Sequence, residues 1–406
     1  MPRAARPRPH LLVFNQYYWP GIEATAQLLT ELCEALADEW DVTVVIGATA
    51  GAGPGRTRRG GVEIIRLAST ALHRRRLAAR SLNYTTYAAL AVAVGMRARR
   101  PDVVLSMTDP PFVGAAAFLA ARRFRAPLVV ISQDVFPEAA VALGRLSNPV
   151  LVKAFGSLVS LYLRRAERVV AIGETMRRRL EEKGVEPRRL RVIPNWVDTA
   201  AIQPVPQGDG WASRNGLSGR FVVMHSGNVG LAQDLDTLIG AATFLRDEDG
   251  IAIVVIGAGA RLTELRSLAQ RLEVEQVSFL PYQPRELLPE SLSAAHVHVV
   301  GLARGLAGLI VPSRLYGILA AGRPVIVSAE EDSETAQLVL EAGCGVVVPP
   351  GRPKELADTI RAARKGEWDL AEMGRRARAY AVEHADRSVA VERYRALLHE
   401  VRGAER

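Results

Sequence analysis

Residues 308–326 read GLIVPSRLYGILAAGRPVI, a stretch that joins a loop, a helix and a strand. Pro312-Ser313 is a typical helix start, Gly322 is a typical helix end, and Pro324 opens the strand that follows. Helices that lead into strands in this way are typical of parallel-sheet proteins. Arg314 in the first helical turn would suit phosphate oxygens. The alternative is an ordinary capped helix with Arg314 on the surface.

The same alternation of apolar runs and helical segments extends in both directions from this stretch. In the first half we predict strands at residues 10–14, 41–46, 103–106, 128–132, 168–172 and 191–193. In the second half we predict strands at residues 221–225, 251–256, 277–279, 297–300, 325–327 and 346–348. The predicted fold class is therefore α/β, with two doubly wound, Rossmann-like domains.

Chain length and a central break give the expected domain boundaries. The chain has 406 residues, more than the ~250–300 at which single cores stop growing. Residues 203–210, QPVPQGDG, are rich in Pro and Gly and are the predicted linker. We expect one domain over 1–203, a second over 204–385, and a closing helix over 386–406 that could fold back on the first domain. In such sheets ligands bind beyond the carboxyl ends of the strands.

Charge is divided unevenly between the two halves of the chain. The net charge is +9, and residues 1–203 hold 29 Lys and Arg against 17 Asp and Glu, which gives +12. Residues 204–406 hold 23 against 26, which gives −3. The basic half favours a polyanionic partner, such as a nucleic acid, an anionic membrane or a phosphorylated substrate. An Arg-rich solvated surface is the alternative explanation.

Several classes of protein are excluded by composition. Cys33 and Cys344 are the only cysteines, which argues against a disulfide framework or a zinc site and favours a reducing cytoplasm. The apolar run at residues 11–14 is too short for the core of a signal peptide. The apolar stretch at residues 88–96 is too short to span a bilayer. We therefore expect a metal-free cytoplasmic protein without a membrane span.

Two loops of the second half have features of a ligand site. The loop HSGNVGLAQD, residues 225–234, contains glycines that permit close backbone approach and the uncharged polar side chains of Asn228 and Gln233. The loop GAGA at residues 257–260 also joins a strand to a helix, although such a glycine pair is often only a turn.

Two loops of the first half are the corresponding candidates. The loop NQYYWPGIE, residues 15–23, gathers aromatic and polar groups that suit a sugar or a lipid-linked ligand, or that simply pack the loop. The loop SQDVFPE, residues 132–138, supplies Asp134 and Glu138. Paired carboxylates can perform acid/base chemistry, whereas Glu138 could only favour a helix start at Pro137.

Taken together, these motifs resemble a known family from about His10 to the closing helix. The general ones are VVAIGETM at 169–176 and VIPNWVD at 192–198; the more specific ones are ATAQLL at 24–29, QDVFPE at 133–138, PSRLYG at 312–317 and EDSETA at 331–336. The chain resembles a retaining glycosyltransferase of family 4, with the GT-B architecture of two Rossmann-like domains facing a central cleft. The specific motifs are similar to a subgroup that builds bacterial surface polysaccharides of the colanic-acid and O-antigen type.

The resemblance implies transfer of a sugar, with retention, from a nucleotide sugar that we expect to be UDP-linked. It implies a glycan or polyprenyl-diphosphate-linked acceptor, no metal and no cofactor, and no nucleic-acid partner. It also implies a cytoplasmic enzyme that contacts the anionic inner face of the membrane peripherally. Domain closure would exclude water from the reaction.

The resemblance also assigns residues to roles. The catalytic candidates are Asp134 and Arg314. The acceptor-binding candidates are Gln16, Tyr17, Glu23 and Asp134. The donor-binding candidates are Gly227, Asn228, Gln233, Gly257, Gly259, Tyr282, Ser313, Arg314, Leu315 and Glu334.

Several positions depart from the family pattern. The Arg and Lys that usually face the pyrophosphate correspond to Asn228 and Gln233, and the two usual glutamates fall on Leu309 and Gly317. A His often found in the acceptor domain is replaced by Gln133. The groups expected to face the donor are therefore partly missing.

These departures leave several alternatives open. The favoured hypothesis is that Arg314 and helix N-termini face the pyrophosphate, while Asp332 or Glu334 binds the ribose. The alternatives are an inactive relative that partners an active transferase, a sugar-nucleotide 2-epimerase of the same shape, and a non-enzymatic polyanion-binding protein suggested by the basic half.

Overall fold

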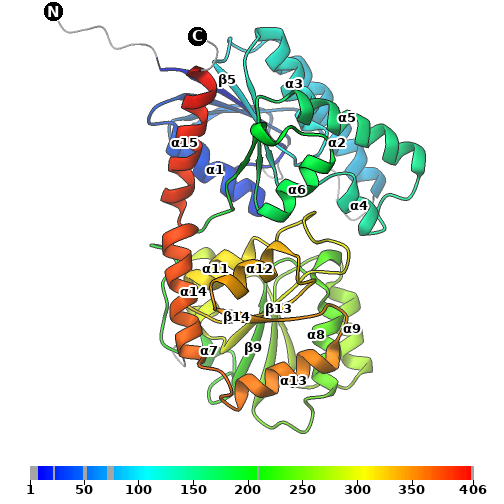
Figure 1. Cartoon of the computed structure of the whole chain (residues 1–406), viewed down its shortest axis with the longest axis vertical. Coiled ribbons are helices and arrows are strands. Elements are labelled where there is room, and N and C mark those ends of the chain that lie inside the picture. Colours follow the sequence, from blue (N-terminus) through cyan, green and yellow to red (C-terminus); the bar gives the residue numbers. More distant parts are fainter. Residues whose placement is uncertain (1–7, 22, 49–52, 71–76, 208–209, 404–406) are drawn as a thin grey trace, which may run out of the picture. The chain divides into compact units, whose positions relative to one another are not determined.

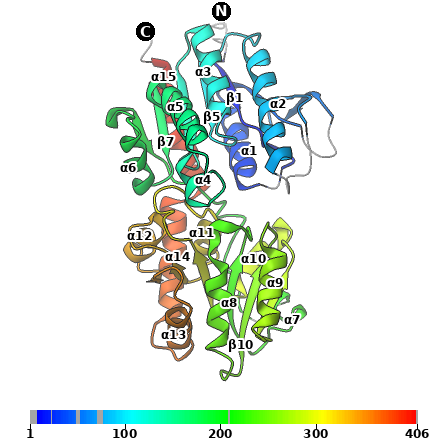
Figure 2. The same cartoon turned by 90° about the vertical axis from the view of Figure 1, so that its right-hand side faces the viewer.

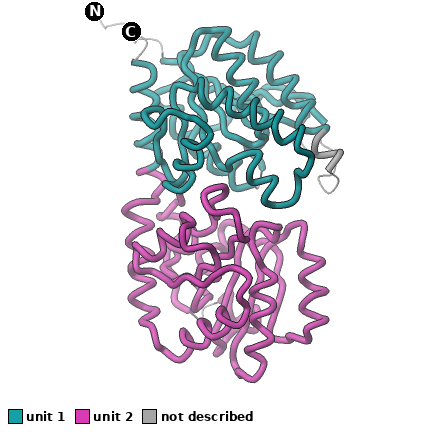
Figure 3. Tube along the Cα trace, turned by 45° about the vertical axis from the view of Figure 1, so that its right-hand side comes forward, with its two compact units in different colours: residues 1–194, 390–406 teal, residues 195–389 magenta. Residues whose placement is uncertain are grey.

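A computed structural model describes residues 8–21, 23–48, 53–70, 77–207 and 210–403 of the chain. The chain divides into two compact units, which have different colours in Figure 3. Unit 1 comprises residues 1–194 and 390–406, and unit 2 comprises residues 195–389. Among the described residues, no helix combines the length and the apolar character that crossing a membrane requires.

Unit 1 is built on an eight-stranded sheet. Its strands are β1 (His10–Phe14), β2 (Asp41–Ile46), β3 (Gly55–Arg59), β4 (Val62–Arg66), β5 (Val103–Met107), β6 (Leu128–Ser132), β7 (Arg168–Ala171) and β8 (Leu190–Val192). They lie in the order β3-β4-β2-β1-β5-β6-β7-β8, and only the β3–β4 pair is antiparallel. Strands β1, β5 and β6 are buried along their whole length, as expected for parallel strands covered on both faces.

The β3–β4 hairpin is the part of unit 1 that the sequence pattern does not predict. All residues of β3, GRTRR, are exposed, so this edge strand has no apolar run. Gly60 and Gly61 turn the chain with φ angles of 52° and 78°, in the left-handed region that favours glycine. Glu63 on β4 holds Arg56 on β3 at 3.2 Å. A charged edge of this kind discourages pairing with other sheets.

The helices of unit 1 cover both faces of the sheet. They are α1 (Ala24–Leu36), α2 (Leu77–Gly95), α3 (Val113–Phe124), α4 (Glu138–Ala142), α5 (Pro149–Arg165), α6 (Glu174–Glu182), the short η1 (Pro187–Arg189) and most of α15 (Arg387–Gly403). Helix α3 contacts both α2 and α5, as Figure 2 shows. Leu29, Leu32 and Leu36 are fully buried and form the apolar face of α1.

Helix α15 belongs to unit 1 from Ala390 onward. Glu400 of α15 lies 2.6 Å from Arg168 of β7 and 2.9 Å from Arg191 of β8. Arg395 donates to the carbonyl oxygen of Ala35 in α1 at 2.9 Å. The last helix is thus fixed to the strand starts and to α1.

Unit 2 is built on a six-stranded sheet in which all pairs are parallel. Its strands are β9 (Phe221–Ser226), β10 (Ile251–Ile256), β11 (Val277–Leu280), β12 (Val297–Gly301), β13 (Val325–Ser328) and β14 (Gly345–Val348), in the order β11-β10-β9-β12-β13-β14. All six predicted strands of this half are present, and each is within one residue of its predicted ends. The segment 203–207, the described start of the predicted linker, packs on this unit, because Val205 N–H donates to Ser293 Oγ at 3.0 Å.

Helices also cover both faces of this second sheet (Figure 1). They are α7 (Trp211–Arg214), η2 (Leu231–Gln233), α8 (Leu235–Thr243), α9 (Leu262–Arg271), η3 (Arg285–Leu287), α10 (Leu288–Ser293), α11 (Arg314–Ala320), α12 (Glu334–Glu341), α13 (Pro353–Arg364) and α14 (Leu370–His384). Along β9 the buried side chains alternate between the two faces of the sheet. Val223 packs in the core with α8, α9 and α13, and Met224 packs with Trp211 on the other face.

The strand orders confirm the α/β class and locate the expected ligand edge. In unit 1 the chain order reverses at β1, which lies between β2 and β5. In unit 2 it reverses at β9, which lies between β10 and β12. Ligands of doubly wound sheets bind at such switch points, outside the carboxyl ends of the strands. The loops after β1, β5, β9 and β12 are therefore expected to carry ligand-binding residues.

Candidate functional site

Two glycine loops of unit 2 pack directly against each other at the carboxyl edge of the sheet. A Cβ atom on Gly257 would lie 1.8 Å from the carbonyl oxygen of Gly227, and one on Gly259 would lie 2.1 Å from that of Val229. Gly227 and Gly257 have φ angles of 145° and 140°, which side chains rarely permit. Gly257 and Gly259 therefore have a structural reason to be glycine, whatever ligand approaches them.

Arg314 begins helix α11 and lies beside the first of these loops. A Cβ atom on Gly227 would lie 3.5 Å from both Cδ and Nε of Arg314. The Nη1 atom of Arg314 is 3.1 Å from each ring nitrogen of His225, the penultimate residue of β9. Arg314 itself is half-buried. The sheet end, the glycine loop and α11 together fix its guanidinium.

The charges at this place are unbalanced. His225 is fully buried, and burial, followed by the nearby Arg314 charge, holds its pKa well below the usual value, so its ring is neutral. Burial lowers the pKa of Arg314 to about 10, which leaves it positively charged at neutral pH. In the described part of the chain, no carboxylate forms an ion pair with Arg314. A half-buried cation without a counter-charge among the described residues favours binding of an anion.

Tyr282, which follows β11, lies next to this cation. Its hydroxyl is 3.4 Å from the carbonyl oxygen of Ala258, and its ring edge would lie 3.5 Å from a Cβ atom on Gly257. The side chain is 47% exposed, and partial burial raises its pKa. An exposed ring beside a fixed cation offers a flat surface to a ligand ring.

Asn228 and Gln233 differ in what the structure does with them. Asn228 is exposed, and its backbone carbonyl oxygen lies 3.3 Å from Nε2 of His225. The side chain of Gln233 is buried, and its Oε1 accepts a hydrogen bond from Gly230 N–H at 2.9 Å. Gln233 thus holds the shape of its own loop, and a direct contact with a donor stays a prediction.

The remaining donor candidates lie on α11 and α12. Ser313 is half-buried at the start of α11, and Leu315 is fully buried in that helix. Glu334 is half-buried in the first turn of α12. Two buried hydroxyls nearby in sequence, Ser328 at the end of β13 and Thr335 in α12, have no hydrogen-bond partner among the described residues. Thr335 lies within the EDSETA motif, but the sequence analysis named neither hydroxyl as a candidate.

In unit 1 the loop after β6 is joined to the loop after β5. Thr108 donates a hydrogen bond to Oδ1 of Asp134 at 2.8 Å, and it accepts one from Gln133 N–H at 3.0 Å. Ser132 donates to the carbonyl oxygen of Asp134 at 2.8 Å. Thr108 follows β5 directly, so its position after a strand is the signal that could have identified it.

The loop after β1 adds further polar groups to the same sheet edge. Gln16 is only 5% exposed, its N–H donates to the carbonyl oxygen of Asp109 at 3.2 Å, and its Oε1 has no partner among the described residues. Thr25 donates to Oδ2 of Asp109 at 3.1 Å. Tyr17 and Glu23 are half-buried in this loop. Asp109 is a carboxylate of this edge that the sequence motifs did not identify.

Metal-ligating side chains do not gather anywhere in the part of the chain that the structure describes. There, no three His, Cys, Asp or Glu side chains are placed to hold one ion. The two cysteines are buried and unpaired.

Family models match almost all of both halves of the chain. Residues 21–196 match the model described as a glycosyl transferase 4-like domain. Residues 211–381 match the model described as glycosyl transferases group 1. The interval between the two matches contains the predicted linker.

Two curated proteins are similar to the chain at the level of sequence. The probable glycosyltransferase WbjE of Pseudomonas aeruginosa is 30% identical over 307 residues, which cover 75% of this chain and 76% of WbjE. The putative colanic acid biosynthesis glycosyl transferase WcaI of Escherichia coli is 30% identical over 278 residues, which cover 66% of this chain and 68% of WcaI.

Solved structures show the same fold. HepE of Anabaena, solved in complex with UDP, has a TM-score of 0.74 at 17% identity and covers 96% of this chain and 100% of its own. WaaG, a glycosyltransferase involved in lipopolysaccharide biosynthesis, has a TM-score of 0.69 at 16% identity and covers 94% of this chain and 98% of its own. The predicted GT-B class is confirmed by these neighbours.

Proposed function

The chain belongs to the glycosyltransferases that combine a glycosyl transferase 4-like domain with a group 1 domain, and from this premise we propose its substrates and mechanism. The donor is a nucleotide sugar linked through UDP. The acceptor is a glycan or a polyprenyl-diphosphate-linked sugar of a surface polysaccharide. Two findings support this choice: HepE is solved with UDP-glucose, and WcaI is described as a putative enzyme of colanic acid biosynthesis.

The observation that carries the donor assignment is the charge of Arg314, which no carboxylate in the described residues pairs. Its guanidinium is held against a neutral His225, so its charge stays available to a ligand. A UDP-sugar presents a diphosphate, and an Arg fork matches phosphate oxygens in geometry and in charge. We therefore place the diphosphate at Arg314, with Gly227 and Tyr282 beside it.

Arg314 would also contribute to the chemical step. As the bond between the sugar and the diphosphate breaks, negative charge grows on the leaving diphosphate oxygens. A cation fixed in advance stabilises that charge without reorganisation at the moment of reaction. We propose that this fixed cation makes a metal ion unnecessary, and that the acceptor attacks from the face that the diphosphate leaves, with retention at the anomeric carbon.

Unit 1 would receive the acceptor. Asp134 has one carboxylate oxygen bonded to Thr108, which fixes its orientation. A carboxylate held in this way can accept a proton from an acceptor hydroxyl as that hydroxyl attacks. Gln16, with a buried side-chain oxygen that has no partner in the described residues, would orient a second hydroxyl. We further propose that the enzyme works in the cytoplasm, at the inner face of the membrane where lipid-linked acceptors lie.

The departures from the family pattern are compatible with an active enzyme. The Oε1 atom of Gln233 accepts a hydrogen bond from Gly230 N–H within its own loop, and this neutral side chain brings no charge to a donor. Leu309 is buried, and Gly317 has no side chain with which to bind ribose. Arg314 remains beside this loop cluster as a cation that no described carboxylate pairs, which favours donor binding over the inactive alternative.

Calorimetric titration with UDP and with uridine tests this assignment. Wild-type protein should bind UDP more tightly than uridine, because only UDP carries the diphosphate. Arg314→Ala should weaken UDP binding roughly 10- to 100-fold, since a charged hydrogen bond contributes about 1.5–3 kcal/mol, and it should leave uridine binding unchanged.

The control variant is Arg352→Ala. Arg352 is an exposed arginine of the same unit that precedes α13, and its Nε lies 3.8 Å from Oε1 of Glu355. This variant should bind UDP as the wild type does. Unchanged UDP affinity in Arg314→Ala would refute the diphosphate assignment.

A further inference from the structure

Helices α4 and α5 of unit 1 carry a group of exposed aliphatic side chains. The described part of the chain has 14 exposed large hydrophobic side chains, and five of them fall between residues 141 and 161. They are Val141, Val150, Leu151, Leu158 and Leu161. Val150 is the most exposed, at 73%. The α5 members recur at helical spacings and so lie on one side of that helix.

The same segment carries positive charge and no negative charge. Residues 139–166 contain neither Asp nor Glu, whereas they contain the cations Arg145, Lys153, Arg164 and Arg165. The acidic residues at the two ends of the segment are neutralised from outside it. Glu138 lies 2.6 Å from Lys183, and Glu167 lies 2.8 Å from Arg168. The outer face of α5 is therefore apolar and cationic together.

Helices α13 and α6 are different. On α13 the cations are matched by acids on the same face: Lys354 lies 2.8 Å from Asp358, and Arg361 lies 2.6 Å from Asp358. On α6, Arg177 lies 2.6 Å from Glu174. These mixed-charge faces are ordinary solvated surfaces. The face of α5 lacks this pattern, so solvation alone does not account for it.

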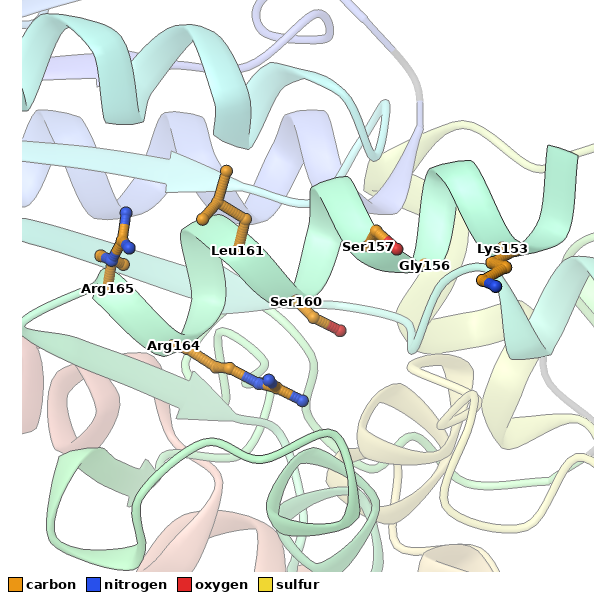
Figure 4. Close-up of a pocket in the computed structure, with 7 residues that line it drawn as sticks. All are labelled: Lys153, Gly156, Ser157, Ser160, Leu161, Arg164 and Arg165. Atoms are coloured by element: carbon orange, nitrogen blue, oxygen red, sulfur yellow. The ribbon is translucent and has the colours of Figure 1, made fainter. Parts of the chain in front are cut away.

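A surface hollow of about 520 Å³ lies along α5 next to the aliphatic side chains. Figure 4 shows Lys153 toward one end of it and Arg164 and Arg165 toward the other, with Ser157 and Ser160 between them. Cations and hydroxyls around an open hollow suit a phosphate headgroup. The adjacent side chains of Leu158 and Leu161 suit the acyl chains of the same lipid.

The chemistry of this face discriminates between possible occupants. A second copy docked through the same face would bring cations against cations, because a two-fold interface pairs each patch with itself. A nucleic acid would match the charge, but single strands are held by exposed aromatic rings, and the exposed large hydrophobics here are all aliphatic. An anionic lipid bilayer matches both properties, since basic residues meet its headgroups and aliphatic side chains enter its interface.

We propose that α4 and α5, residues 138–165, form the surface that docks this enzyme on anionic lipid bilayers. The inference deepens the proposed function and rests on it for its purpose, which is to bring unit 1 to a lipid-linked acceptor. Helix α5 lies in the interface with its apolar side toward the acyl chains. Each cation near the anionic surface strengthens partitioning roughly fivefold.

Co-sedimentation of the full chain with lipid vesicles tests the proposal. Wild-type protein should bind vesicles of phosphatidylglycerol, bind vesicles of phosphatidylcholine far more weakly, and be released by added salt. The double variant L158E/L161E should lose at least tenfold in partitioning to phosphatidylglycerol, because it places two acids on the apolar face. Lys153→Gln should lose roughly fivefold.

Matched variants in unit 2 control for charge and exposure. Leu340→Glu on α12 makes the same change at a leucine that is 54% exposed, and Lys354→Gln on α13 removes the charge of another exposed lysine. Both should sediment with vesicles as the wild type does. UDP titration of L158E/L161E should be unchanged, which shows that the variant is folded and separates loss of docking from failure of the donor assignment.

Three results would overturn the proposal. The first is wild-type protein that ignores phosphatidylglycerol vesicles. The second is equal vesicle binding by wild type and by a folded L158E/L161E, which would place the membrane contact elsewhere. The third is a wild-type dimer in solution that L158E/L161E dissociates without any vesicle binding, which would assign the face to a second copy.

Discussion

The loop clusters at the carboxyl edges of the two sheets have opposite chemistry. In unit 1 this edge holds carboxylates fixed by hydroxyl donors: Asp134 by Thr108, and Asp109 by Thr25. In unit 2 it holds Arg314 against a neutral imidazole. One edge is suited to accept protons from hydroxyls, and the other is suited to hold a diphosphate. Two sheets of similar topology are thus specialised by a few residues in their loops.

Removal of the unit 1 carboxylate is expected to have the largest effect. Asp134→Asn keeps the shape of the side chain but cannot accept a proton in the same way. If Asp134 acts on the acceptor hydroxyl, kcat for sugar transfer should fall 10²- to 10⁴-fold. The assay is transfer from UDP-sugar to an acceptor lipid extract, with Glu34→Gln on α1, a half-buried acid of the same unit that pairs with Arg59 at 2.7 Å, as the control. If Asp134→Asn transferred sugar as fast as the wild type, Asp134 would not be the group that acts on the acceptor hydroxyl.

Disruption of the contact between Gly257 and Gly227 in unit 2 is expected to have the next largest effect. Gly257→Ala places a Cβ atom 1.8 Å from the oxygen of Gly227, at a φ of 140°. We expect a loss of about 4 kcal/mol in the free energy of unfolding, from backbone strain and overpacking together. Chemical denaturation measures it. Gly351→Ala, at a φ of 74° with open space around it, should lose only about 1 kcal/mol, and equal losses would refute the loop contact.

Acid should destabilise unit 2 through its buried histidines. His298 is fully buried, its Nε2 donates to the carbonyl oxygen of Leu292 at 2.9 Å, and burial lowers its pKa to about 4. The unfolded chain, with a pKa near 6.5, binds the proton first, so stability should fall as pH drops from about 6.5 to about 4. The loss should reach about 3 kcal/mol.

Hydrogen exchange at pH 5 and at pH 7, compared between the two units, measures this effect. Unit 2 should lose protection at pH 5, and His298→Asn should reduce the loss. In unit 1, His10 also has a lowered pKa from burial, but it is less deeply buried. A larger loss of protection in unit 1 would contradict the difference that we infer between the units.

The smallest expected effect concerns the residue that orients the carboxylate. Thr108→Val keeps the side-chain shape and removes the hydroxyl that donates to Asp134 at 2.8 Å. We expect roughly a tenfold loss in kcat with unchanged KM for the UDP-sugar, since one hydrogen bond to a charged group is lost. Thr108→Ser should restore most of the activity. Failure of Ser to restore it would show that packing of Thr108, not its hydroxyl, matters.

The fold was largely predictable because most of its strands are marked by short apolar runs in the sequence. Apolar runs such as His10–Phe14 and Ile251–Ile256 are buried on both faces, so composition alone marks them as strands. The β3–β4 hairpin was not predictable, because β3 is exposed and charged and is held by pairing to β4. Its strand character comes from tertiary context, not from its own sequence.

The site was predictable only in part because its contacts join distant segments. Position after a strand identified Asp134 as a candidate, and position in the first turn of a helix identified Arg314. The contact of Arg314 with His225 connects residues far apart in sequence, and no motif shows that the histidine is buried and neutral. Gln233 illustrates the converse, because an uncharged polar residue in a promising loop bonds Gly230 within that loop. Thr108 and Asp109 also follow a strand, β5, so their position could have identified them as candidates in the same way.

The most direct test of the division between the two edges is titration of UDP-glucose against Arg314→Ala and Asp134→Asn side by side. We predict that Arg314→Ala weakens binding roughly 10- to 100-fold and that Asp134→Asn binds as the wild type does, although its turnover is lost. Weakened binding in Asp134→Asn together with wild-type binding in Arg314→Ala would contradict this prediction.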